Sequence, residues 1–207
     1  SLDYDGSDAG GQHDGTPDSA VEFGVEGQIN YGARFSSNTT GIVNTSLRLN
    51  STAHSISLWV KPAEVVSGRW NTIFMSNFLG YPSGFLGKRF DQSTSFHYRT
   101  ESGTELYFTL ASADTWYHIV ITRDSGGVDI YVDGSFVTSN SDSMGTYSSS
   151  FYEKASIGSN SVYPAEYFKG SIDQVRIFSK ALSSDEIDTL YAETACVHTA
   201  TTTNINY

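Results

Sequence analysis

Short segments in which apolar and polar residues alternate recur along most of the chain, and clusters of Gly, Asp, Asn and Ser separate them. In residues 55–60, Ile56, Leu58 and Val60 fall on one side of an extended backbone. Pro62 ends this segment, because proline cannot donate a hydrogen bond to a neighbouring strand. The alternation is typical of strands that bury one face, and it predicts an all-β fold of two stacked antiparallel sheets.

Two neighbouring strands are predicted at residues 116–122 and 128–132. Asp133 and Gly134 follow, and because an Asp-Gly pair tolerates positive φ, a second tight turn leads into a strand at 135–137. Further strands are predicted at residues 96–99, 106–110, 155–158 and 169–178. The apolar spacing of the last segment breaks once, which indicates a bulge or a change of face.

A single segment has the pattern of a helix. Ser183 and Glu186 have the spacing of a capping box, and Ile187, Leu190 and Tyr191 follow at helical spacing. We expect a short C-terminal helix that covers one end or edge of the sandwich.

The composition supports this interpretation. The chain has 207 residues, of which 38% are hydrophobic and 14% aromatic, and a disordered chain would have few aromatic residues. The length suits one large β-sandwich domain, which we expect at residues 1–195. Residues 196–207 are rich in Thr and lack an apolar period, so they are predicted to form a linker towards a following domain.

The charge narrows the classes of partner. With 12 Lys and Arg against 23 Asp and Glu, the net charge of -11 repels nucleic acid, which is therefore not expected as a partner. No apolar stretch approaches the length of a spanning helix, so membrane insertion is not expected. The first residues lack the pattern of a signal peptide, and any export signal must lie outside this sequence. The single cysteine, Cys196, cannot form an internal disulfide.

Five segments in one order carry a family resemblance. They are residues 55–62, 116–122, 129–134, 170–178 and 181–187. Together they resemble the successive signatures of laminin-G-like domains of the concanavalin A-like lectin/glucanase superfamily, and residues 2–16 are similar to the lead-in of that family. The resemblance implies a two-sheet jelly roll whose first and last strands pair near the termini.

The resemblance also bears on location and partners. The Thr-rich tail is similar to spacers that join consecutive domains in bacteriophage structural and tail proteins. We therefore expect a multidomain protein of the virion surface or of the extracellular space, with neighbouring domains of the same protein as partners.

Calcium is the expected cofactor. Asp5, Asp8 and Asp14 lie in a Gly-rich segment that is too polar for a core strand, and calcium takes about six to eight oxygen ligands of this kind. Laminin-G-like domains with this lead-in often hold a calcium between the lead-in and the acidic residue of the last strand, which here is Asp173. The resemblance therefore implies a stabilising calcium held by Asp5, Asp8, Asp14 and Asp173.

A carbohydrate site would need aromatic faces for stacking and polar groups for the sugar hydroxyls. The candidates are Trp70, Tyr81, Phe85, Arg89, Asp91, His97, Tyr98 and Tyr107 in the centre of the chain and Tyr163 and Tyr167 in a late loop. Residues 78–85 are the strongest single stretch, because exposed aromatic residues beside Gly and Pro are poorly explained by packing.

Catalysis is not expected. Retaining glucanases of the superfamily carry a Glu-x-Asp-x-Glu run on one strand, and the sequence has none. The acidic cluster at 185–188 lies in the predicted helix, where it complements the helix dipole. The sequence thus predicts a non-catalytic recognition or adhesion module for surface carbohydrate. The alternatives are a structural decoration domain that makes protein contacts and, less favoured, a divergent glycoside hydrolase.

Overall fold

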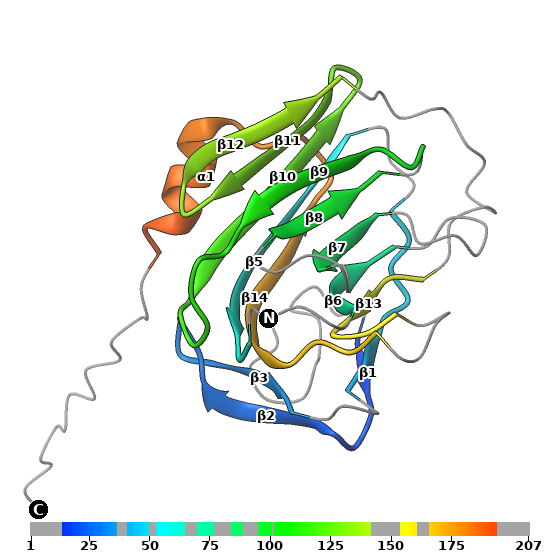
Figure 1. Ribbon diagram of the computed structural model, residues 1–207, viewed down its shortest axis with the longest axis vertical. Coiled ribbons are helices and arrows are strands. Elements are labelled where there is room, and N and C mark those ends of the chain that lie inside the picture. The colour runs from blue at the N-terminus through cyan, green and yellow to red at the C-terminus, as the bar shows by residue number, and fades with distance from the viewer. Residues whose placement is uncertain are drawn as a thin grey trace, which may run out of the picture.

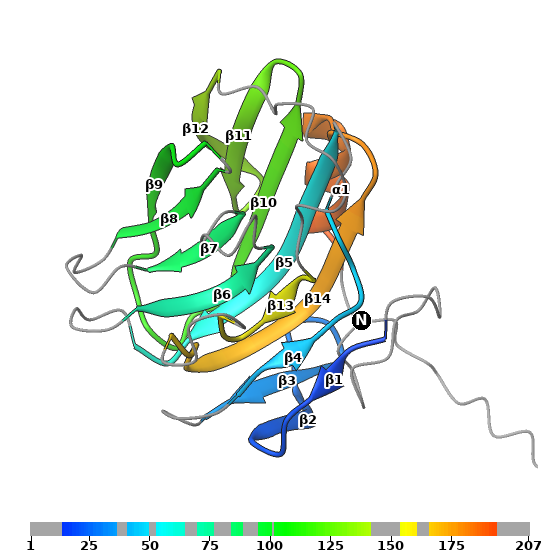
Figure 2. The ribbon, with the colours of Figure 1, turned by 90° about the vertical axis from the view of Figure 1, so that its right-hand side faces the viewer.

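Two antiparallel sheets of seven strands each are stacked face to face in the computed structural model (Figure 1). The structure describes residues 14–36, 41–49, 53–64, 70–76, 84–88, 95–100, 102–141, 154–160 and 166–193. Figure 2 shows the sheets as two layers, with β6 to β9 in one and β5, β10 and β14 in the other. The predicted all-β jelly-roll sandwich with one short helix is confirmed.

The first sheet, sheet A, comprises, in spatial order, β1 (Thr16–Pro17), β4 (Val43–Asn44), β13 (Ser156–Ile157), β6 (Asn71–Met75), β7 (Phe85–Lys88), β8 (Ser95–Arg99) and β9 (Glu105–Thr109). The second sheet, sheet B, comprises β12 (Ser135–Asn140), β11 (Gly127–Val132), β10 (Tyr117–Asp124), β5 (His54–Pro62), β14 (Gly170–Phe178), β3 (Tyr31–Phe35) and β2 (Val21–Glu26). The last strand, β14, lies between β5 and β3 in sheet B, whereas the first strand, β1, pairs with β4 in sheet A. Among the described residues, the first and last strands therefore do not pair, and the implied pairing was wrong.

The core lies between the two sheets and is built by the predicted alternation. Ile56, Leu58 and Val60 of β5 all point into it and are almost completely buried. Sheet A contributes rings from the other side, and the centroids of Phe96 and Phe108 lie 6.1 Å apart. Burial of these faces is the main favourable contribution to the stability of the sandwich.

Two local predictions about turns and bulges are confirmed. Asp133 and Gly134, between β11 and β12, have φ values of 50° and 76°, as a tight hairpin turn requires. In β14 the register against β5 shifts between Asp173 and Arg176, and Gln174 has a φ of 47° within this bulge. The bulge explains the break in the apolar spacing of the strand.

Helix α1 (Ser184–Tyr191) begins with the predicted capping box, in which Ser183 and Glu186 satisfy each other's backbone N–H groups. The expectation that it covers an end or edge of the sandwich was wrong. Ile187 and Leu182 pack on Val120 of β10, so the helix covers the outer face of sheet B (Figure 1). Val120 is apolar and points away from the core, so it would be exposed to solvent if the helix did not pack on it. Within the described part of the chain, no helix is long and apolar enough to cross a membrane.

Candidate functional site

The outer face of sheet A, turned away from the core, gathers most of the described side chains that were predicted to bind ligand. Phe96 and Tyr98 of β8 point into the core, so His97 between them points outward. In the register of the sheet, Gly87 of β7 and Tyr107 of β9 lie directly beside His97. Because paired residues of neighbouring strands share a face, these positions form a line across the sheet.

Four rings on this face contact one another, and we call them the aromatic row: Trp70, Phe85, His97 and Tyr107. The ring centroid of His97 lies 5.0 Å from that of Phe85 and 5.5 Å from that of Tyr107. The Trp70 ring meets Phe85 edge-on at 5.9 Å. Ring pairs at these separations attract one another, and these contacts therefore stabilise the arrangement of the four side chains.

Gly87 makes room for the row. A Cβ atom at Gly87 would lie 2.7 Å from Cζ of Phe85 and 2.1 Å from the carbonyl oxygen of Asn71. The ring of Phe85 therefore lies flat against the sheet over Gly87. Phe85 and His97 are buried, whereas Trp70 is partly exposed and Tyr107 is 42% exposed. The surface offered to a ligand is thus that of Trp70 and Tyr107, supported by two buried rings.

Polar groups lie at the two ends of this face. Beside Tyr107, the carboxylate of Glu105 accepts a hydrogen bond from the Tyr107 hydroxyl and lies 3.9 Å from Arg99. At the other end, the Glu166 carboxylate accepts a 2.9 Å hydrogen bond from the Asn160 amide, and its backbone carbonyl oxygen accepts one from the Thr72 N–H at 3.3 Å.

Burial raises the pKa of the half-buried Glu166 carboxyl, and the hydrogen bond from Asn160 and the nearby Thr72 hydroxyl partly oppose the rise. Sequence reasoning missed Glu166, Asn160 and Thr72, because none of them belongs to a motif. Glu166 does lie next to Tyr167, in the late loop where only aromatic residues were considered.

The predicted ligand-binding residues do not all lie on the same face of the sheet. Trp70, Phe85, His97 and Tyr107 lie together in the aromatic row. Tyr98 belongs to the core, because alternation along β8 turns it to the inner face, and it is fully buried there. Tyr167 is half-buried and forms a parallel bridge with Thr72 at the edge of the site. The candidates outside the described residues are Tyr81, Arg89, Asp91 and Tyr163.

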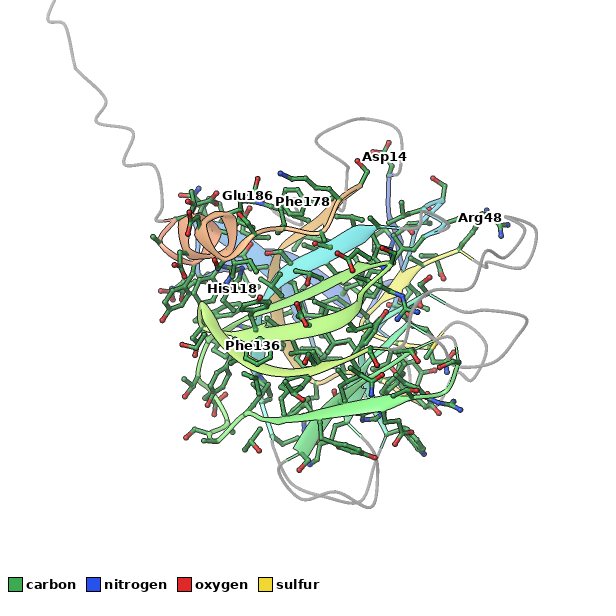
Figure 3. All side chains as sticks on the ribbon, turned by 90° about the horizontal axis from the view of Figure 1, so that it is seen from above. Asp14, Arg48, His118, Phe136, Phe178 and Glu186 are labelled. Atoms are coloured by element: carbon green, nitrogen blue, oxygen red, sulfur yellow. The ribbon has the colours of Figure 1, made fainter. Side chains whose placement is uncertain are left out.

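Asp173 lies on the opposite side of the sandwich, on the outer face of sheet B. It is fully buried, and its carboxylate accepts a 2.8 Å hydrogen bond from the backbone N–H of Ile29 and a 2.6 Å bond from that of Gln174. Asp14 is exposed near β1 (Figure 3), and Asp5 and Asp8 lie outside the described residues. Among the residues that the structure describes, no three His, Cys, Asp or Glu side chains form a metal-binding group.

A second group of rings lies under α1 (Figure 3). His118, Trp59 and Tyr191 contact one another pairwise: the His118 ring centroid lies 5.0 Å from that of Trp59 and 6.0 Å from that of Tyr191, and the latter two lie 5.7 Å apart. The Nε2 atom of His118 lies 2.9 Å from the Ser57 hydroxyl. Its backbone N–H donates to the Asp133 carboxylate. Burial lowers the pKa of His118 to about 4, and nearby charges make smaller contributions: Arg176 lowers the pKa and Glu193 raises it. Trp59 and His118 are buried beneath the helix, whereas Tyr191, in the helix itself, is 41% exposed.

The sandwich and the aromatic row on its outer face define a lectin-like jelly roll. A family model described as the concanavalin A-like lectin/glucanases superfamily, of laminin G type, matches residues 15–188. The chain belongs to this family. No curated protein is significantly similar to the chain in sequence.

Solved structures of other proteins share the fold. Domain 4 of AbnA, a GH43 extracellular arabinanase from Geobacillus stearothermophilus solved in complex with arabinotriose, has a TM-score of 0.68 and 22% identity over 90% of this chain and 93% of that one. The receptor-binding domain of botulinum neurotoxin type G has a TM-score of 0.63 and 17% identity, with 86% of this chain and 46% of that chain covered.

The binding domain of Paraclostridial Mosquitocidal Protein 1 has a TM-score of 0.64 and 16% identity, with 89% of this chain and 48% of that chain covered. The chain thus spans just under half of each of the two toxin-derived chains. At these identities the likeness establishes the fold.

Proposed function

We propose that this domain is a non-catalytic recognition module that binds neutral carbohydrate on the aromatic row of sheet A. The observation that carries the proposal is the contact of Trp70, Phe85, His97 and Tyr107 on one outer face. Sugars present C–H faces that stack on aromatic rings, and they present hydroxyl groups that need donors and acceptors at the edges of the stack. Arg99, Glu105 and Glu166 supply such groups.

The charge supports an uncharged ligand. The chain carries a net charge of -11, and a carboxylate lies at each end of the face, which disfavours an anionic polysaccharide. The arabinanase domain, whose fold this chain shares, was solved with arabinotriose. Arabino-oligosaccharides are therefore the first ligands to test, and xylo- and gluco-oligosaccharides follow.

The spacing of carboxylates on this face argues against glycoside hydrolysis. Glu105 lies in β9 and Glu166 contacts Thr72 of β6, so the two stand about three strand spacings apart, roughly 14 Å. Hydrolases need their two carboxyl groups about 5 to 9.5 Å apart. This pair cannot flank one glycosidic bond, which supports a binding role.

The module is proposed to act outside the cell or on a virion surface, as one domain of a larger protein, and to contain a stabilising calcium. The support for calcium is the acidic lead-in with Asp5, Asp8 and Asp14, together with the buried carboxylate of Asp173. Carboxylate oxygens are the ligands that calcium prefers. In this proposal the ion ties the lead-in to β14 and does not contact the sugar.

The test of carbohydrate binding compares single variants by affinity electrophoresis and calorimetry. Trp70→Ala and Tyr107→Ala each remove a stacking ring, which is worth about 0.5 to 1.5 kcal/mol beyond its buried area, so affinity falls by roughly three- to tenfold or more. Tyr31→Ala is the matched control, because Tyr31 on sheet B is 44% exposed. If no neutral polysaccharide binds, or if all three variants bind alike, the site is elsewhere or absent.

A protein-contact module is the second candidate. It is favoured by Phe136 and Val137 on β12, the last strand of sheet B, which are 57% and 43% exposed. Exposed apolar side chains on an edge strand are a common site of protein association. Loss of association with neighbouring domains in Phe136→Ser, without any carbohydrate binding by the parent protein, would favour this role.

A further inference from the structure

Glu166, Asn160 and Thr72 form a polar group on the face that carries the aromatic row. Thr72 pairs with Gly87 in the register of β6 and β7, so its side chain lies on the same outer face as His97 and Tyr107. Glu166 lies beside Thr72, because its backbone carbonyl oxygen accepts a 3.3 Å hydrogen bond from the Thr72 N–H, and its carboxylate accepts one from the Asn160 amide. The carboxylate is thus placed at one end of a line that runs from Thr72 through Gly87 and His97 to Tyr107.

The line is longer than one sugar. Its four positions belong to four neighbouring strands and span three strand spacings, roughly 14 Å. A linear saccharide extends by roughly one strand spacing, about 5 Å, per unit. A monosaccharide cannot touch both Tyr107 and Glu166, whereas a chain of about three units laid across the strands can.

The environment of Glu166 suits a hydrogen-bond acceptor that is held in place. Asn160 and Thr72 are fully buried, and Glu166 is half-buried. A carboxylate offers about four acceptor positions, and the bond from Asn160 occupies one of them. The remaining acceptor capacity suits a pair of adjacent sugar hydroxyls, and a carboxylate binds such donors more strongly than a neutral group does.

On the basis of the proposed carbohydrate site, we propose that Glu166 anchors one end of a neutral oligosaccharide that lies across β6 to β9. The stacking rings of Trp70 and Tyr107 hold the sugar faces, and Glu166 accepts hydrogen bonds from the hydroxyl groups of the unit nearest β6. The site therefore selects ligands by length, and it releases them when the carboxylate is protonated.

The experiment measures the affinity of the full chain for arabinose and for arabino-, xylo- and gluco-oligosaccharides of two to five units by calorimetry. In the parent protein the affinity rises up to about three units and then levels off. Glu166→Gln keeps the size of the side chain and removes its charge, and it lowers affinity for the trimer about tenfold or more. Its melting temperature serves as the check of folding.

A pH series gives a readout that a merely structural role would not move. Because burial raises the pKa of Glu166, the parent protein loses trimer affinity on acidification at a higher pH than an ordinary glutamate would cause, and Glu166→Gln shows no such loss. The inference is overturned if Glu166→Gln binds the trimer as the parent does, or if both show the same pH profile. If Trp70→Ala still abolishes binding in that case, the proposed function stands without the anchor; if the parent binds no saccharide, the proposed function itself fails.

Discussion

Replacing Asp173 by Asn tests how a buried carboxylate holds the turn between β2 and β3. Asp173 is completely buried, and it accepts hydrogen bonds from the backbone N–H groups of Ile29, in that turn, and of Gln174, in the β14 bulge. The turn packs so closely that a Cβ atom on Gly27 would lie 2.6 Å from an Asp173 oxygen. The Asp173 side chain therefore links the turn between β2 and β3 to the bulge in β14.

The expected loss follows from these two bonds. Asn retains one acceptor, but its NH₂ group then faces an N–H donor, so one bond to a charged group worth about 1.5 to 3 kcal/mol is lost. The buried N–H that is left without an acceptor costs about 1 to 3 kcal/mol more. The sum is about 2.5 to 6 kcal/mol. For a domain of this size, that lowers the melting temperature by roughly 10 °C.

Thermal unfolding followed by circular dichroism, in calcium and in chelator, measures this loss and tests the proposed ion. In chelator, Asp173→Asn should still melt about 10 °C below the parent, because the hydrogen bonds need no metal. If calcium is also bound there, it raises the melting temperature of the parent and leaves that of Asp173→Asn unchanged.

The control is Asp114→Asn, since Asp114 is exposed and its φ of 55° is one that Asn tolerates. A melting temperature of Asp173→Asn within about 2 °C of the parent in chelator would refute the hydrogen-bond reasoning. An unchanged parent melting curve on adding calcium would remove the proposed ion.

Two further predictions concern the outer face of sheet B. Ser183→Ala removes half of the capping box of α1 and should cost about 1 kcal/mol in denaturant unfolding, whereas Ser184→Ala, one residue later, should cost nothing; equal effects would contradict the cap. His118 has a folded pKa of about 4 against 6.5 for the unfolded chain, so the unfolded state binds the proton first. Stability should therefore fall by about 3 kcal/mol as the pH drops from about 6.5 to about 4, and a slope that persists in His118→Gln would assign it to other groups.

Most of the strands could be predicted because their signals are local. Asp133 and Gly134 indicate a tight turn by their backbone preferences alone, and the β10, β11 and β12 meander follows from it. The bulge in β14 was visible as a break in the apolar alternation around Asp173 and Gln174. In each case the residues that form the feature are neighbours in the sequence.

The position of α1 could not be predicted in the same way. The capping box and the apolar spacing of Ile187 and Leu190 are local, and they identified the helix correctly. The surface it covers is made by Val120 and Tyr131, in strands far away along the chain. Whether an apolar residue on the outer face of a strand stays exposed or receives a helix depends on tertiary packing, which the local pattern does not contain.

The candidate site was partly predictable for a related reason. An aromatic side chain is a candidate for sugar stacking by its residue type alone, so Trp70, Phe85 and His97 were predicted, but Glu166 was not. Its role depends on meeting Asn160, six residues earlier, and Thr72, which is far away along the chain and is brought beside it only by the fold. A polar group assembled from separate segments leaves no spacing in the sequence to recognise.

His97 and Tyr98 show most clearly where sequence reasoning ends. They are adjacent in β8, both are suited by type to a carbohydrate site, and alternation requires that they point to opposite faces. One of the two faces must be the core, and the pairing with Gly87 and Tyr107 places His97 outside and Tyr98 inside. Because a shift of one residue would exchange the two faces, the register of β8 decides which of these aromatic residues belongs to the site.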